Sequence, residues 1–150
     1  MIAPPRVLFV CVQNAGRSQM AAALLDRIAQ GRVEVRSAGS APAAAVHPGV
    51  VEAMREIGID LSGATPRTLV PADLERADVV VTMGCGDACP VAPGRRTEDW
   101  AIEDPAGKSV EAVRAIRDDL ERRVRTLLDE IEAGAPTAAG PGGEAPSTVS

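Results

Sequence analysis

The chain has 150 residues, of which 45% are hydrophobic and 25% are charged, and this suits one domain with an apolar core. Sixteen Lys and Arg against 21 Asp and Glu give a formal net charge of -5, which argues against a nucleic-acid binder that relies on a positive surface field. The chain has one Phe, one Trp and no Tyr, which argues against a base-stacking surface for single strands.

Three cysteines are present, an odd number and too few for a secreted disulfide framework. The sequence contains no apolar run of about 18 residues and no signal-peptide pattern at its start. We therefore expect a cytoplasmic protein that binds neither a membrane nor nucleic acid. Each cysteine is a candidate core residue, metal ligand or reactive thiol.

The first part of the chain alternates between strand and helix patterns. Apolar and β-branched residues at 6–10 predict a strand buried on both faces, as in a parallel sheet. Apolar residues at helical spacing predict a helix over 18–30 that stops at Gly31. Residues 33–37 read as the next strand, so this part of the chain forms a βαβ unit.

Further along, Pro48 precedes a predicted helix, and residues 78–83 predict a third buried strand. Residues 95–100 are a candidate edge strand. Ser109 is the predicted N-cap of a long final helix whose apolar stripe reaches Ile131 and faces the core.

From Gly134 on, the chain consists mostly of Ala, Pro, Gly, Ser and Thr, a composition typical of disordered segments. We predict one domain over residues 1–133 and a disordered tail without a catalytic role over 134–150. Strands that alternate with helices predict an α/β fold with its site at the C-terminal ends of the strands.

Residues 11–18, Cys-Val-Gln-Asn-Ala-Gly-Arg-Ser, join the first strand to the first helix. Such a loop at a helix N-terminus can point successive backbone N–H groups into one concavity, where the helix dipole adds positive potential. A tetrahedral oxyanion fits there, with the fork of Arg17 on two of its oxygens. Cys11 would lie beneath the anion, where this field and a hydrogen bond from Ser18 favour the nucleophilic thiolate.

The predicted oxyanion-binding residues are Val12, Gln13, Asn14, Ala15, Gly16, Arg17 and Ser18. Asn14 is expected to hold the loop in shape because Asn tolerates the left-handed conformation, and Gly16 is expected to allow close approach to the anion. The C-x5-R spacing alone leaves an alternative open, in which Cys11 is a small buried hydrophobe and Arg17 an exposed residue at the helix start.

Besides Val-Leu-Phe-Val-Cys at 7–11 with the C-x5-R-S loop, the chain contains Ser-Ala-Gly at 37–39, Gly-Ile-Asp-Leu-Ser at 58–62 and Asp-Pro at 104–105. Together these segments resemble the low-molecular-weight protein tyrosine phosphatases and the arsenate reductases that share their fold. The resemblance implies a three-layer α/β sandwich with a four-stranded parallel sheet. It also implies Cys11 as nucleophile, Arg17 as oxyanion binder and Asp104 as general acid.

Two features favour the reductase branch. Gln19-Met20 after Ser18, and Ala-Gly-Lys after the Asp-Pro pair, are similar to arsenate reductases, whereas the phosphatase branch usually has Pro after the Ser and aromatic residues after Asp-Pro. The chain has no Tyr, and no wall for a phenol ring is evident. The alternative is a low-molecular-weight protein tyrosine phosphatase with the same nucleophile, anion binder and acid.

Cys85 and Cys89 follow the third predicted strand and are therefore expected at the same sheet edge as Cys11. We predict a thiol relay. Cys11 attacks the arsenic of arsenate while Asp104 protonates the departing oxygen. Cys85 then forms a disulfide with Cys11 and releases arsenite, and Cys89 takes the disulfide over from Cys11.

Three residues separate Cys85 from Cys89, fewer than in the best-known reductases. In a regular helix this pair would be too far apart for a disulfide, so bridging needs a distorted segment, which Gly84 and Gly86 permit. The alternative is a pair of buried structural thiols.

No organic cofactor and no metal is expected, because the spacing of the three cysteines and His47 matches no zinc ribbon or finger. His47 is expected at a helix entry or on the surface. The expected partners are arsenate, phosphate as a competing anion, and thioredoxin or mycothiol with mycoredoxin as electron donor. A non-catalytic oxyanion-binding or redox-sensing module would keep the loop but tolerate loss of Asp104.

Overall fold

The computed structural model of the protein describes residues 4–84 and 95–134. Within these residues the elements are, in order, β1 (Arg6–Cys11), α1 (Arg17–Ala29), β2 (Glu34–Gly39), α2 (Pro48–Arg55), α3 (Pro71–Arg76), β3 (Val79–Thr82), β4 (Arg96–Asp99) and α4 (Val110–Glu132). The strands form a four-stranded sheet in the order β2-β1-β3-β4. Every strand pair is parallel.

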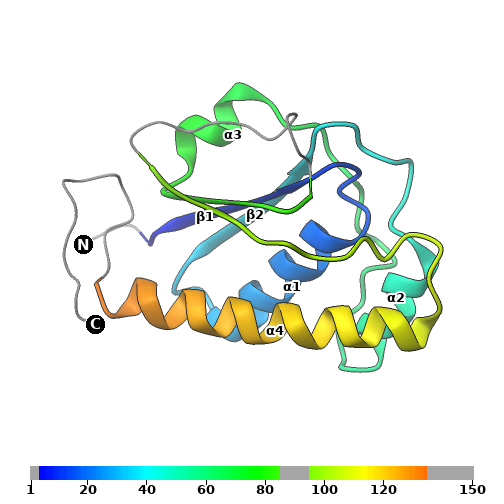
Figure 1. The fold of residues 1–150 in the computed structure, drawn as a ribbon. Helices are drawn as coiled ribbons and strands as arrows, with labels where there is room; N and C mark the ends of the chain where they lie inside the picture. The colour runs from blue at the N-terminus through cyan, green and yellow to red at the C-terminus, as the bar shows by residue number, and fades with distance from the viewer. Residues whose placement is uncertain (1–3, 85–94, 135–150) are drawn as a thin grey trace.

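Helices cover both faces of this sheet, which gives three layers. Figure 1 shows α3 on one side of the sheet and α1, α2 and α4 on the other. Side chains of β1 alternate between the two layers: Val7 and Phe9 belong to the larger apolar cluster with α1 and α4, whereas Leu8 and Val10 belong to a smaller cluster. A strand buried on both faces explains the continuous apolar run at 6–10.

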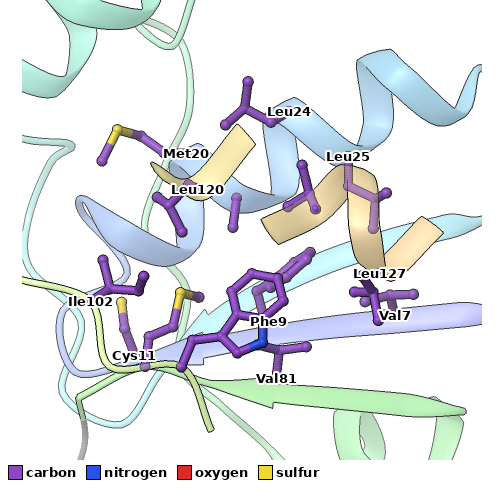
Figure 2. Packing of buried hydrophobic residues seen from close by; sticks show 14 of the residues in the cluster. Val7, Phe9, Cys11, Met20, Leu24, Leu25, Val81, Ile102, Leu120 and Leu127 are labelled. Carbon is purple, nitrogen blue, oxygen red and sulfur yellow. The ribbon is translucent and has the colours of Figure 1, made fainter. Parts of the chain in front are cut away.

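The larger cluster supports the end of the sheet at which β1 stops. Figure 2 shows Phe9 at its centre and Cys11 at one end. The Phe9 ring packs against Trp100 with 5.8 Å between centroids. The long helix α4 contributes a stripe of buried side chains, Val113, Ile116, Leu120, Val124, Leu127, Leu128 and Ile131. Cys11 is therefore held by a rigid core.

The predicted elements are confirmed within one or two residues at most boundaries. Ser109 caps α4 as predicted, since its Oγ accepts a hydrogen bond from the N–H of Ala112 at 3.2 Å. Helix α2 begins at Pro48 and ends at Arg55. The six residues of α3 were not predicted, because so short a helix has no readable apolar period.

One prediction lies largely outside this part of the chain. The predicted disordered tail, apart from Gly134, falls on residues that the structure does not describe, so the domain boundary stays a prediction. None of the helices in the described residues is long and apolar enough to cross a membrane.

Candidate active site

The site is built on the turn from β1 into α1, where residues 12–16 connect the strand to the helix. Asn14 adopts a left-handed conformation with φ 50°, a conformation that Asn tolerates better than most residues. Gly16 occupies the N-cap of α1 and offers no side chain to cap it, and the first turn carries no acidic residue. The positive end of the helix dipole is therefore available to an anion.

The carbonyl groups of the loop point away from this concavity. Four of them accept backbone hydrogen bonds of 2.8–3.1 Å from residues 40–47: Cys11 from Ser40, Val12 from Ala41, Gln13 from Ala43 and Ala15 from His47. Within residues 4–84 and 95–134, no acceptor is found for the backbone N–H groups of Gln13, Ala15, Gly16 and Arg17. The loop thus keeps several donors for an oxyanion.

The sulfur of Cys11 lies at the base of the loop and is buried. It is 2.9 Å from the Oγ of Ser18 and accepts the backbone N–H of Asn14 at 3.3 Å. The Nδ2 of Asn14 donates to the same Ser18 Oγ at 2.7 Å, so the Ser18 proton is free to point at the sulfur. The Ser18 hydroxyl and the backbone N–H of Asn14 therefore both lie within hydrogen-bond distance of the sulfur.

Asn14 is itself held by partners that the sequence did not indicate. Its Oδ1 accepts the backbone N–H of Arg67 at 2.9 Å and the Nε2 of Gln19 at 3.2 Å. The Arg67 guanidinium donates to Asp73 at 2.8 Å. Burial raises the pKa of Asp73, but the hydrogen bonds from Arg67 and from the backbone N–H of Val70 outweigh burial, and the pKa is lowered. An ionised Asp73 thus anchors the segment that orients Asn14.

Arg17 and Asp104 lie across from each other at the mouth of the site. Nη2 of Arg17 is 3.8 Å from the Oδ2 of Asp104, and the side chains are 9% and 53% exposed respectively. The other end of the guanidinium, Nη1, donates to the carbonyl of Ile102 at 3.3 Å. Asp104 accepts the N–H of Ala106 at 3.0 Å, so a local turn orients its carboxylate while leaving it accessible to solvent.

Gly16 has a neighbour that the sequence did not predict. A Cβ built on it would lie 2.6 Å from the Cγ of Pro105. The loop therefore packs directly against the turn that carries Asp104. His47 is the N-cap of α2 and precedes Pro48 at its first position, which is the helix entry that was predicted.

The structure thus brings Cys11, Arg17, Ser18 and Asp104 together. Cys85 and Cys89 lie outside the described residues. The chain leading to them starts at this sheet edge, because Thr82 is opposite Val10 and the N–H of Met83 donates to the Val10 carbonyl at 2.8 Å.

Comparisons with known proteins place this geometry in context. A family model described as low molecular weight phosphotyrosine protein phosphatase matches residues 6–136. A Halobacterium salinarum protein provisionally named an arsenate reductase is 49% identical over 128 residues, covering 82% of this chain and 90% of that protein.

Solved structures agree with the sequence matches. A thioredoxin-dependent arsenate reductase of Corynebacterium glutamicum is similar with a TM-score of 0.77 and 43% identity, over 89% of this chain and 65% of that one. This chain therefore spans less than two thirds of that protein's length.

Two further similar structures are an arsenate reductase and an arginine phosphatase. An arsenate reductase in a phosphate-binding state has a TM-score of 0.76 and 34% identity, over 85% of this chain and 98% of that one. An arginine phosphatase of Geobacillus stearothermophilus has a TM-score of 0.75 and 30% identity, over 87% of this chain and 95% of that one.

Proposed function

The chain belongs to the low molecular weight phosphotyrosine protein phosphatase family, and from this premise we propose that it is an arsenate reductase with Cys11 as nucleophile. The observation that carries the proposal is the Cys11 sulfur beneath a loop of free N–H donors, with Arg17 and Asp104 facing each other at its mouth. The arsenate reductases among its relatives support arsenate as the oxyanion.

In the first step, arsenate binds in the loop, and two of its oxygens accept hydrogen bonds from the Arg17 guanidinium. The Cys11 thiolate attacks arsenic, a sulfur–arsenic bond forms, and one arsenic–oxygen bond breaks. Asp104 donates a proton to the departing oxygen, which leaves as water. A bound anion also competes with Asp104 for the guanidinium of Arg17, which frees the carboxyl group to carry that proton.

In the second step, the Cys85 thiolate attacks the sulfur of Cys11. A disulfide forms between them, the sulfur–arsenic bond breaks, and its electron pair stays on arsenic, which leaves as arsenite. Cys89 then attacks Cys85, which releases the Cys11 thiolate and leaves a disulfide between Cys85 and Cys89. The position of Met83 beside Val10 supports this route, since the chain beyond it starts next to Cys11.

An external dithiol must then return two electrons to the Cys85–Cys89 disulfide. Thioredoxin is favoured as the donor, because the similar Corynebacterium glutamicum enzyme is thioredoxin-dependent. Mycothiol with mycoredoxin is the other candidate donor. Mycothiol would leave a mixed disulfide on Cys11 if it attacked the Cys11 sulfur of the arsenic intermediate and released arsenite. Phosphate is expected to compete with arsenate for the loop, because both are tetrahedral oxyanions.

The test is a single turnover of the fully reduced protein with arsenate and no added reductant. We expect arsenite to form with loss of two thiols per arsenite. Cys85→Ser should form no arsenite, whereas Cys89→Ser should complete one turnover and stop as a Cys11–Cys85 disulfide visible by peptide mass analysis. Arsenite formation by Cys85→Ser in this assay would overturn the order of the relay.

The second candidate is a phosphatase, which the similar arginine phosphatase structure favours. It would use Cys11, Arg17 and Asp104 in the same roles and hydrolyse a phosphocysteine with water. Unreacted arsenate, together with turnover of an aryl phosphate or of phosphoarginine, would support this function instead.

A further inference from the structure

We propose that Gly84 is a positioning residue for the Arg17 guanidinium and thereby sets the affinity of the loop for oxyanions. The inference rests on the proposed function in that it concerns the same anion site. It does not depend on whether the anion is subsequently reduced.

The backbone of Gly84 lies directly against the Arg17 side chain. A Cβ built on Gly84 would be 2.0 Å from Nη1 of Arg17, 3.0 Å from its Cζ and 3.6 Å from its Nη2. Real Cβ atoms essentially never approach a heavy atom that closely. The guanidinium therefore occupies the space that a side chain at position 84 would take.

Arg17 is enclosed on its other sides as well. The carbonyl of Ile102 accepts from Nη1 at 3.3 Å, Asp104 lies 3.8 Å from Nη2, and the residue is only 8% exposed. With Gly84 as a further wall, the long side chain is confined to one place beside the loop. Such preorganisation lowers the loss of conformational entropy that accompanies anion binding.

A side chain at position 84 should displace the guanidinium and leave most of the fold in place. The clashing atoms are the far end of a flexible side chain, so the guanidinium can give up its contact with Ile102 and shift while the backbone stays in place. Gly84 also has φ +73°, a left-handed conformation in which any L residue is strained. The two effects must be separated by a control that carries the strain alone.

Gly31 provides that control. Its φ is +87°, and a Cβ there would meet nothing within 4 Å. It also lies at the opposite end of α1 from the loop. Gly31→Ala should therefore carry the left-handed backbone strain without touching Arg17.

The experiment measures binding of inorganic phosphate to the reduced full chain by calorimetry, with protection of Cys11 from alkylation as a second readout. We expect Gly84→Ala to bind phosphate about tenfold more weakly, as loss of one charge-assisted contact predicts. Gly31→Ala should bind within about twofold of the wild-type affinity. Equal phosphate affinity of Gly84→Ala and the wild type would overturn the proposal.

A double-mutant cycle tests whether the effect passes through Arg17. In an Arg17→Lys background no guanidinium is present, so adding Gly84→Ala should change phosphate affinity by less than about twofold. The same tenfold loss in both backgrounds would contradict the proposed mechanism. If Gly84→Ala does not fold, Gly84→Asn replaces it, because Asn tolerates a left-handed backbone and still carries a Cβ.

The outcome is independent of the reductase proposal. Phosphate binding requires no electron transfer, so a protein that binds phosphate as described but leaves arsenate unreduced would refute the proposed function only.

Discussion

Replacement of Asn14 tests the buried hydrogen-bond network of the loop. Its side chain donates to Ser18 Oγ at 2.7 Å and accepts from Arg67 N at 2.9 Å and from Gln19 at 3.2 Å, and the residue is 0% exposed. Each bond contributes about 1 kcal/mol net. Asn14→Ala loses all three and leaves buried partners unpaired, so we expect a loss of about 3 to 4 kcal/mol in the free energy of unfolding.

The left-handed conformation of Asn14 needs its own control, and Gln30 supplies it. Gln30 has φ 49° and is exposed at the C-cap of α1. Gln30→Ala should change the free energy of unfolding by no more than about 0.5 kcal/mol, as is usual for surface positions.

The assay is urea denaturation at neutral pH, with the slope m compared between variants to check that they unfold alike. Phosphate should also bind more weakly to Asn14→Ala, because Ser18 loses its orienting partner. A loss below about 1 kcal/mol for Asn14→Ala, or an equal loss for Gln30→Ala, would refute the reasoning that the network holds the loop.

Three further predictions concern pH, catalysis and the core. Because the pKa of Asp73 is lowered in the folded state by Arg67 and Val70 against the effect of burial, its contribution to stability is present above its unfolded pKa of about 3.9 and is lost as pH falls through the folded value. Asp73→Asn should therefore be less stable at neutral pH and lose less stability on acidification; parallel stability–pH curves from urea titrations would count against this. Asp104→Ala should lower arsenate turnover by about 10²-fold or more with phosphate affinity retained, and unchanged turnover would point to a non-catalytic module. Phe9 is 0% exposed in the core, so Phe9→Ala should lower the free energy of unfolding by about 3 to 5 kcal/mol. A smaller loss, measured from the urea midpoint, would show that the cavity collapses.

The arrangement of the candidate nucleophile and its loop could be predicted because these residues are contiguous in the chain. Cys11, Arg17 and Ser18 stand within one strand-to-helix turn, so their spacing along the chain determines how they are arranged around the loop. The backbone geometry of such a turn depends on only a few consecutive residues, so a short sequence motif is enough to predict it.

Asp104 was predicted only through the family resemblance. Nothing in its own surroundings distinguishes it from an ordinary turn-starting Asp before a Pro. Its place opposite Arg17 depends on how the chain between β4 and α4 crosses the end of the sheet. Gly84 was singled out for backbone freedom, and the structure adds its contact with Arg17.

The α/β order of elements, the buried central strand and the strand-to-helix loop at Cys11 could be predicted from the sequence, because apolar periodicity and turn chemistry are local properties. The contacts by which Arg67 and Asp73 orient Asn14 exist only in the folded chain, where Arg67 reaches Asn14 across 53 positions. Packing of the sheet and helices brings these groups together. Single hydrogen bonds and close approaches between distant segments have no period along the chain, so they become visible only once the chain has folded.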